Sequence, residues 1–218
     1  MSDNHPDAII SDVMMPEMDG LHFCKKIKQN IQTSHIPIIL LTAKSEISQQ
    51  LRGFEMGTDD YILKPFSIAL LDAKVKTLLR TRDRLRNYYK NTREIEPEKL
   101  TFNHLDQGFL EKTIAIIESN LDEYNFSVEI LSQELGMSRT NLYLKIKAIT
   151  GDTVTAMIKR IRLKKAVELL RERKHSLSEI AYKCGFNTPS YFSTAFKQVY
   201  GCMPSEYLEK QGENTPPS

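Results

Sequence analysis

The chain has 218 residues, of which 40% are hydrophobic and 27% charged, and its formal net charge is +2. This length suits one large or two small domains with buried apolar cores. No apolar run approaches the length that spans a bilayer, and the N-terminus lacks a basic-then-apolar signal sequence, so we expect a cytoplasmic protein. The cysteines, Cys24, Cys184 and Cys202, lack metal-ligand spacing, which predicts buried thiols in a reducing compartment.

Three short apolar runs near the N-terminus each end at a polar residue. The runs are residues 8–11, ending at Asp12, residues 37–41, ending at Thr42, and residues 61–63, ending at Lys64. Continuous apolar runs joined by helical stretches predict parallel strands covered on both faces. Sites in such sheets lie at the carboxyl ends of the strands. A carboxylate, a hydroxyl and an ammonium converging there suit phosphoryl transfer, with the carboxylate as nucleophile and the other two groups binding phosphoryl oxygens.

The sequences around these three residues resemble response-regulator receiver domains. The matching segments are SDVMMPEMDG from Ser11, LTA from Leu41 and YILKPF from Tyr61. The resemblance implies a flavodoxin-like α/β domain, represented by its last three strands. It implies that Asp12 is the phosphoacceptor, Thr42 the switch hydroxyl, Tyr61 the switch aromatic and Lys64 the strand-five lysine. A cis Lys64–Pro65 bond is expected as well, because proline makes the cis form accessible.

The match departs from the family at its start, because it begins only at the third of five strands. The acidic residues upstream of Asp12, Asp3 and Asp7, do not end a strand, so the acidic pair that holds Mg²⁺ in receivers has no counterpart. We therefore expect no cofactor in this chain and Mg²⁺ only in a complete receiver. Without the metal, the charge of a phosphoryl donor is not neutralised, so Asp12 should work efficiently only if another chain supplies the missing half.

The incomplete sheet should also expose an apolar edge at its first strand, which favours dimerisation or swapping. The simplest expectation is that the chain is the C-terminal piece of a longer protein. The order of its parts resembles the cytoplasmic end of hybrid two-component sensors, in which a histidine kinase lies upstream on the same polypeptide.

Two segments about fifty residues apart, 128–151 and 177–201, have the same organisation. Each has a short amphipathic helix, a glycine at a sharp turn, a Ser or Thr that can cap, and a second helix. Gly136 and Gly185 lie where a left-handed backbone is needed. These features predict two helix-turn-helix units, which could read successive major grooves without a partner subunit.

Helical spacing assigns a direction to each residue of the two second helices. Leu142, Ile146 and Ile149 should point inward in the first, and Phe192, Phe196 and Val199 in the second. The residues expected to contact DNA are Arg139, Thr140, Asn141, Tyr143, Leu144 and Lys147 in the first unit and Ser190, Tyr191, Ser193, Thr194 and Lys197 in the second.

A continuous helix is predicted between the two units, from Thr153 to Arg171. As a rigid spacer it would hold the second helices about 34 Å apart, one turn of B-DNA. Eleven lysines and arginines against three acidic residues between Arg139 and Lys174 suit a phosphate backbone. The basic residues of the spacer helix that could contact phosphates are Lys159, Arg160, Arg162, Lys164 and Lys165.

The C-terminal pattern resembles the AraC/XylS family of transcription regulators over roughly a hundred residues. The residues that carry the resemblance are Ile161-Arg162-Leu163, Ala166, Leu169-Leu170, Ile180-Ala181, Gly185-Phe186, Tyr191-Phe192, Phe196-Lys197, Gly201, Pro204-Ser205 and Tyr207. The family implies an all-α, seven-helix domain with two helix-turn-helix motifs that binds duplex DNA. Leu144 and Thr194 depart from it, because the family commonly has a basic residue at each position. Leucine could at most pack on a thymine methyl, so base preference there is open.

These patterns predict a receiver segment over 1–81, a linker over 82–106, an AraC-type domain over 107–210 and a disordered tail over 211–218. Leu71, Val75, Leu78, Arg82, Leu85 and Tyr89 recur at intervals of three and four residues. This spacing leaves two interpretations open. Either the last receiver helix runs on to Tyr89 and pairs with a copy of itself, or its first turns pack on the sheet and the rest is a basic surface helix.

The sequence thus predicts a DNA-binding transcription regulator, not an enzyme, controlled by phosphorylation of a receiver. The expected partners are double-stranded DNA, a histidine kinase or an upstream kinase domain of the same polypeptide, RNA polymerase and a second copy of the chain. One alternative is a constitutive DNA-binding or assembly module whose receiver segment makes only protein contacts. Another is a haloacid-dehalogenase-like phosphatase, but that family needs a second aspartate where Met14 stands.

Overall fold

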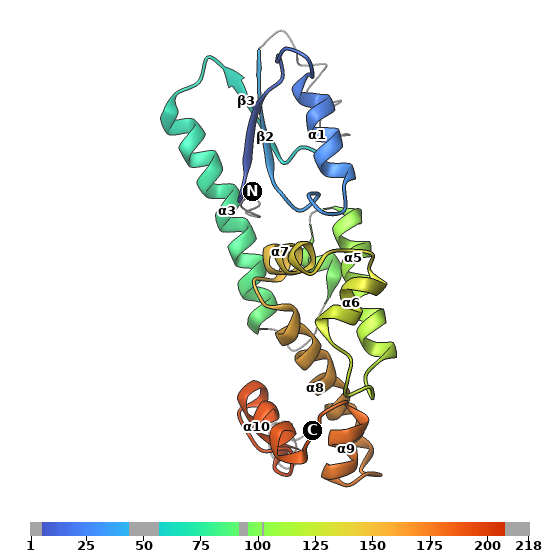
Figure 1. The fold of residues 1–218 in the computed structure, drawn as a ribbon. Coiled ribbons are helices and arrows are strands. Elements are labelled where there is room, and N and C mark those ends of the chain that lie inside the picture. Colours follow the sequence, from blue (N-terminus) through green and yellow to red (C-terminus); the bar gives the residue numbers. More distant parts are fainter. Residues whose placement is uncertain (1–5, 44–56, 92–95, 102, 208–218) are drawn as a thin grey trace. The chain divides into compact units, whose positions relative to one another are not determined.

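The computed structural model describes residues 6–43, 57–91, 96–101 and 103–207 (Figure 1). The chain divides into two compact units. The first comprises residues 1–111 and 140–152, and the second comprises 112–139 and 153–218. The tail predicted to be disordered lies outside the described residues. No helix in the described segments is both long and apolar enough to cross a membrane.

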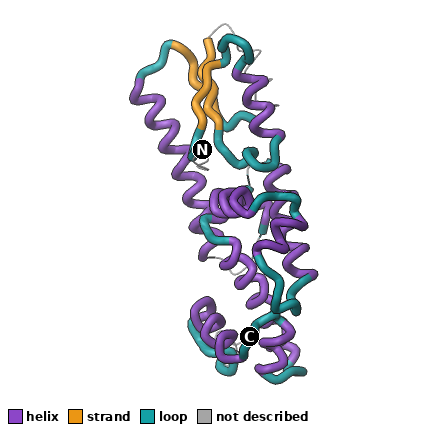
Figure 2. The backbone as a smooth tube through the Cα atoms, in the orientation of Figure 1, coloured by secondary structure: helices purple, strands orange, loops and turns teal. Residues whose placement is uncertain are grey.

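The first compact unit contains a parallel sheet in the order β1-β2-β3, formed by Ile9–Asp12, Ile38–Ala43 and Asp60–Lys64 (Figure 2). Ile38, Ile39 and Leu40 have no exposed surface, because the central strand is covered on both faces. The three predicted strands and their parallel order are therefore confirmed. All three end at the same edge of the sheet, where the polar residues were expected.

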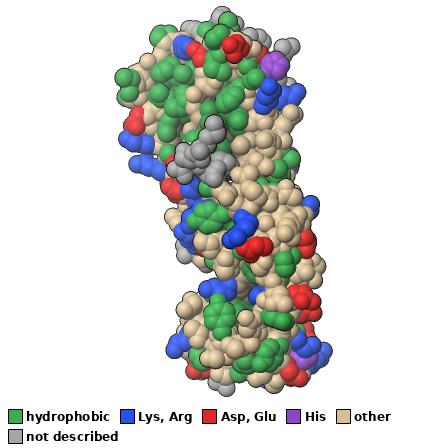
Figure 3. Space-filling view, in the orientation of Figure 1, with side chains coloured by type: hydrophobic (Ala, Val, Ile, Leu, Met, Phe, Trp, Pro, Cys, Tyr) green, Lys and Arg blue, Asp and Glu red, His purple; other side chains and the backbone are tan. Residues whose placement is uncertain are grey.

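One face of the sheet packs against helix α1, Gly20–Gln29. Val13, Cys24, Ile38, Leu40 and Tyr61 form the buried cluster between them. On the other face, hydrophobic side chains gather over the strands and over the start of helix α3, which begins at Ile68 after β3 (Figure 3). β1 is an edge strand of the described sheet, as expected, and its Ile10 is 45% exposed. Leu63, on the strand at the other side of the sheet, is 43% exposed.

Helix α3 runs from Ile68 to Asn91, so the last helix of the receiver segment continues past Tyr89. The short α4, Pro97–Leu100, and the start of α5, His104–Ser119, follow. The linker predicted over 82–106 is thus largely helical where it is described. The physical reason is burial: Arg82 is 8% exposed and Tyr89 has no exposed surface, so this stretch packs against its own chain.

The loop between α1 and β2, residues 30–37, is held by buried charges. Lys28 donates to the Ile36 carbonyl at 2.9 Å and to the Asp59 carboxylate at 2.6 Å. The Arg82 guanidinium donates to the His35 carbonyl and lies 3.5 Å from Asp59. Because buried ions are stable only when paired and hydrogen-bonded, these contacts fix the loop to β3 and α3.

A second buried ion pair joins this loop to helices α5 and α7, the latter spanning Arg139–Thr150. Lys145 of α7 has no exposed surface and pairs with Asp106 of α5. The Ser34 hydroxyl donates to Asp106 at 2.7 Å and accepts from Lys145 at 2.9 Å, and Asn103 donates to the second Asp106 oxygen at 2.8 Å. Burial works to raise the pKa of Asp106, but Lys145 and these hydrogen bonds outweigh it and lower that pKa overall.

The second compact unit is helical, with α6 (Val128–Glu134), α8 (Val154–Glu172), α9 (Leu177–Lys183) and α10 (Pro189–Tyr200). The predicted continuous helix between the repeats is confirmed by α8, whose N-terminus is capped by the Thr153 side chain. Its apolar residues pack with Ile180, Phe192 and Phe196 in one core.

Most of the predicted inward residues are buried, with one exception. Leu142, Ile146 and Ile149 of α7 are buried, and so are Phe192 and Phe196 of α10. Val199, however, is 41% exposed, so its predicted inward direction was wrong. The last turn of α10 fills its core with aromatic rings instead, because Tyr200 and Tyr207 both stack on Phe196, with ring centres 4.5 and 5.3 Å away.

Replacing Asp106 with Asn should destabilise the protein by about 3 kcal/mol, because the Lys145 ammonium would stay buried without its counterion. Urea unfolding of the full chain, followed by circular dichroism, measures this loss. Asp72→Asn is the matched control, because Asp72 pairs with Lys76 on an exposed helix surface and should contribute less than about 0.5 kcal/mol. Equal losses in the two variants would contradict a structural role for the buried pair.

Candidate functional site

Two of the predicted receiver residues meet at the carboxyl edge of the sheet. Asp12 ends β1 and Lys64 ends β3, and their side chains form an ion pair although the residues are 52 positions apart. Both remain accessible, with the Asp12 side chain 31% and the Lys64 side chain 42% exposed. The predicted cis Lys64–Pro65 bond directly after the lysine is confirmed.

The environment keeps the Asp12 carboxylate ionised. The hydrogen bond from Lys64 is the largest cause that lowers the pKa of Asp12, and the backbone N–H of Met14, 3.1 Å from Oδ1, lowers it further. An accessible, ionised carboxylate can act as a nucleophile, and the adjacent ammonium can neutralise charge on an incoming phosphoryl group.

Thr42 and Tyr61 are placed differently from this pair. Thr42 lies one residue before the end of β2 but is only 1% exposed, and its hydroxyl donates to the Ala43 carbonyl at 3.4 Å. Tyr61 is buried in the cluster beneath α1, and this burial raises the pKa of its phenol to about 12. The structure therefore joins Asp12 to Lys64, while Thr42 and Tyr61 are inner residues on the neighbouring strands.

Gly20 supports the phosphoacceptor, a role that the sequence motif alone did not indicate. A Cβ atom built on Gly20 would lie 2.1 Å from the Asp12 carbonyl oxygen, well inside contact distance. The Gly20 amide also donates to the Val13 carbonyl at 2.9 Å. The start of α1 is thus pressed directly onto the backbone of the strand that carries Asp12. The signal in the sequence was a glycine at the first position of a helix, capped by Asp19.

A Mg²⁺ ion, which the receiver family implies, does not fit the side chains present. The Asp12 oxygens are engaged by Lys64 and the Met14 amide, and no three acidic, His or Cys side chains of the described segments gather into a metal site. Asp7 lies before β1, at the opposite end of the strand from Asp12, and Asp3 lies outside the described residues. Within the part of the chain that the structure describes, the edge thus provides a carboxylate and an ammonium but no metal cage.

The turns of the two repeated units have the same hydrogen bonds. In the first, Gly136 and Met137 donate to the carbonyls of Gln133 and Ser132; in the second, Gly185 and Phe186 donate to those of Tyr182 and Ala181. Both glycines have a left-handed backbone, with φ of 65° and 69°. At Gly185 a Cβ atom would also lie 2.4 Å from the Leu121 carbonyl oxygen. These observations confirm two helix-turn-helix turns at the predicted glycines.

The second helix of the second helix-turn-helix unit, α10, presents most of its predicted contact residues to solvent. Ser190, Tyr191, Thr194 and Lys197 are exposed, and Ser193 is half-buried. The Thr194 hydroxyl donates to the Ser190 carbonyl at 3.1 Å, so it is left as an acceptor rather than a donor toward a base. The face is polar, with one lysine in its last turn.

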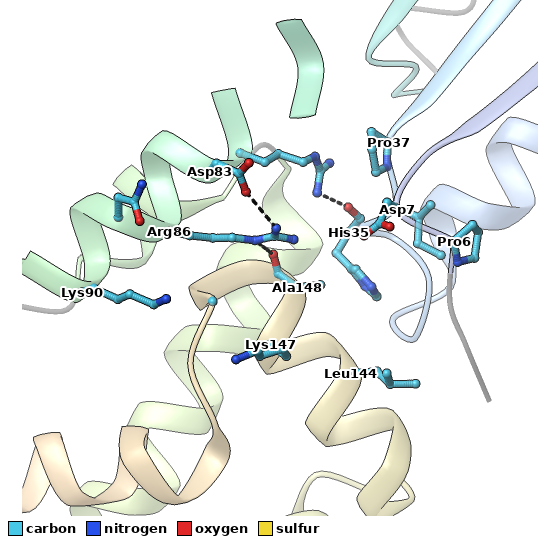
Figure 4. Close-up of a pocket in the computed structure, with 14 residues that line it drawn as sticks. Pro6, Asp7, His35, Pro37, Asp83, Arg86, Lys90, Leu144, Lys147 and Ala148 are labelled. Atoms are coloured by element: carbon cyan, nitrogen blue, oxygen red, sulfur yellow. Dashed lines mark hydrogen bonds and ion pairs between the residues drawn. The ribbon is translucent and has the colours of Figure 1, made fainter. Parts of the chain in front are cut away.

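The second helix of the first helix-turn-helix unit, α7, has a more mixed outer face. Thr140, Tyr143 and Lys147 are exposed, whereas Asn141 and Leu144 are half-buried. Leu144 and Lys147 line a cleft together with residues of the receiver segment (Figure 4). These two residues, both predicted to contact DNA, therefore border a cleft inside the first compact unit.

Two other basic residues, both in the second compact unit, already have protein partners. Arg139 pairs with Glu129 at 2.7 Å, although both side chains are largely exposed and such a pair is weak. The Arg162 guanidinium donates to the Glu123 carbonyl at 2.7 Å and lies against Gly185, so this residue also stabilises the second compact unit.

Comparison with known proteins assigns both parts of the chain. Residues 1–76 match the response regulator receiver domain family, and residues 131–210 match a helix-turn-helix domain family. The chain joins a response regulator receiver segment to a helix-turn-helix segment.

Curated relatives contain one or both parts. Histidine kinase P4 of Formosa agariphila is 43% identical over 210 residues, which are 96% of this chain but 15% of the kinase. The transcriptional regulatory protein YclJ of Bacillus subtilis is 53% identical over 74 residues, which are 34% of this chain and 31% of YclJ. The chain thus spans less than a third of the length of either protein.

Among solved structures, the C-terminal domain of the two-component response regulator yesN from Fusobacterium nucleatum is 30% identical. The match covers 46% of this chain and 97% of that domain, with a TM-score of 0.43. The C-terminal domain of AraT, a response regulator from Geobacillus stearothermophilus, is 29% identical over 50% of this chain and 92% of that domain, with a TM-score of 0.44. These TM-scores add no weight of their own, so the assignment depends on the two family matches.

Replacing Gly20 with Ala should destabilise the receiver segment by about 1–3 kcal/mol, because the new methyl group would push against the Asp12 carbonyl. Thermal and urea unfolding of the full chain measure the change. Gly108→Ala is the matched control: Gly108 lies inside α5, and a methyl group there would have no atom within 4 Å, so alanine should be neutral or stabilising by up to about 1 kcal/mol. A Gly20→Ala protein as stable as the control would remove the packing role of Gly20.

Proposed function

We propose that this chain is the output end of a two-component system, a sequence-specific DNA-binding transcription regulator controlled by phosphorylation of Asp12. The observation that carries the proposal is the accessible Asp12–Lys64 pair at the end of a parallel sheet, in the same chain as two helix-turn-helix turns of matching geometry. In this proposal, the Asp12 carboxylate attacks phosphorus, and the leaving group of the donor departs with the electron pair.

The proposed donor is a histidine kinase, either separate or upstream on the same polypeptide. The resemblance to histidine kinase P4, which extends over nearly all of this chain, supports an upstream kinase. The further proposed partners are duplex DNA, RNA polymerase and a second copy of the chain, and the proposed compartment is the cytoplasm. The proposed protein turns over no substrate of its own, so it is a regulator and not an enzyme.

The domain boundaries remain part of the proposal, with a receiver segment over 1–81, a connection over 82–106 and a DNA-binding domain over 107–210. The alternative is a constitutive DNA-binding or assembly module whose receiver segment makes only protein contacts. One observation favours it: the 30–37 loop of the receiver segment is hydrogen-bonded to α5 and α7 through Ser34, a contact that needs no phosphorylation.

Incubation of the full chain with acetyl phosphate and Mg²⁺ should add one phosphoryl group, detected by intact mass spectrometry, because Asp12 is accessible and ionised. The addition should be slower than in a complete receiver, because the described residues form no metal site. The Asp12→Asn protein should gain no phosphoryl group. The Asp72→Asn protein, which lacks an exposed helix carboxylate, should gain one, as the chain without substitutions does. A chain that stays unmodified under conditions that label a complete receiver would favour the constitutive alternative.

Selection of duplexes from a random-sequence pool by the full chain should recover a preferred sequence. Lys197→Ala should weaken binding of that duplex and reduce the slope of log affinity against log salt by about 1, because an exposed lysine on α10 would release one counterion. Lys112→Ala, on the exposed side of α5, is the control and should change neither quantity. Recovery of no preferred duplex would refute sequence-specific binding.

A further inference from the structure

The outer side of α7 faces a cleft of about 500 Å³ inside the first compact unit (Figure 4). Leu144 and Lys147 line it on one side, and Asp7, His35 and Arg86 are among the residues that line it from the receiver segment and α3. A helix in a major groove about 12 Å wide needs free space on both flanks for the two phosphate backbones. The receiver segment occupies that space beside Leu144, and the cleft is far too small for a duplex.

The first attachment that keeps α7 in this position is the buried Lys145 cluster. Asp106 of α5 neutralises the Lys145 ammonium, while Ser34 is the contribution of the receiver segment. If the receiver segment left, Lys145 would keep its counterion Asp106 and lose the neutral partner Ser34. A hydrogen bond between a neutral and a charged group is worth roughly a ten- to hundredfold factor, so the attachment can be reversed. If the receiver segment itself carried the counterion, its departure would leave the Lys145 charge unpaired, and the attachment would be permanent.

The second attachment comes from α3. The Arg86 Nε donates to the Ala148 carbonyl of α7 at 2.9 Å. The Arg86 side chain also packs against the end of α7, where a Cβ atom at Gly151 would lie 3.0 Å from it. Arg86 pairs with Asp83 on its own helix at 3.2 Å, which orients the guanidinium. The 30–37 loop of the receiver segment and the last turns of α3, which continue from it, therefore hold the same short helix.

We propose that the receiver segment and duplex DNA compete for α7, so that the first helix-turn-helix unit can enter a major groove only after α7 separates from the 30–37 loop and α3. This inference rests on the proposed DNA-binding function and goes beyond it, because it names the helix that is withheld and the residues that withhold it. Competition for one surface is reciprocal: duplex DNA loosens the receiver segment by the same factor by which the receiver segment weakens DNA binding.

The test uses the full chain with Arg86→Ala, which removes the bond to Ala148 without touching the predicted DNA-contact residues. We expect about tenfold tighter binding to a duplex of about 40 base pairs recovered from the random pool, long enough for two neighbouring helical turns. We also expect faster amide hydrogen exchange in residues 140–150 of the free protein. Ser34→Ala, which removes the hydrogen bonds of the other attachment, should shift both quantities in the same direction.

Arg84→Ala is the matched control, because Arg84 lies exposed on the same helix and its loss removes the same charge. It should leave amide exchange unchanged and should not tighten binding. If Arg86→Ala weakens binding and Arg84→Ala does not, Arg86 is a phosphate contact and the proposal is overturned. Unchanged binding and unchanged exchange in both Arg86→Ala and Ser34→Ala would overturn it as well.

Amide exchange needs no DNA, so it separates this inference from the proposed function. If no protein binds any duplex but exchange in residues 140–150 rises in Arg86→Ala, the proposed function fails and the hold of the receiver segment on α7 is supported. If exchange is also unchanged, both fail.

Discussion

A lysine with no exposed surface sets the main constraint on the first compact unit. Burying an ammonium costs several kcal/mol, so Lys145 must find a counterion and enough acceptors in a fixed geometry. Asp106 and Ser34 provide them, and they come from two segments that are 39 and 111 residues away in the chain. The beginning of α5, the 30–37 loop and α7 therefore have to take their places together. Phe109 completes the site, with its ring centre 4.9 Å from the ammonium.

The same loop connects this cluster to the phosphoacceptor edge. Asp59, next to the first residue of β3, pairs with Lys28 and Arg82 and accepts from the Ile38 amide at 2.8 Å, while the other end of β3 carries Lys64. A single five-residue strand thus separates the group that contacts Asp12 from the charges that position the loop. This strand belongs to one hydrogen-bonded sheet, in which β3 pairs with β2 along its whole length.

Most of the local structure could be predicted because its cause is local. Apolar runs ending at Asp12 and Lys64 predicted the strands, their parallel order and the edge at which the two residues meet. Helical spacing predicted the buried side of α7 and the length of α8. The role of Lys145 could not be predicted, since its partners Asp106 and Ser34 are distant in sequence. The role of Gly20 depends on how closely α1 approaches the Asp12 carbonyl, which the sequence does not show. The continuation of α3 past Tyr89 was one of two interpretations left open, because spacing alone does not show that Tyr89 and Arg82 are buried.

The two turns of the repeat differ in one respect, which concerns how the protein would sit on DNA. Three positions separate Gly136 from the start of α7 at Arg139, whereas four separate Gly185 from the start of α10 at Pro189. The additional residue lies in the turn before α10, not inside a helix, and it lengthens the connection between Gly185 and that helix. The two helix-turn-helix units are therefore not copies of each other, and the bases that suit one are not expected to suit the other.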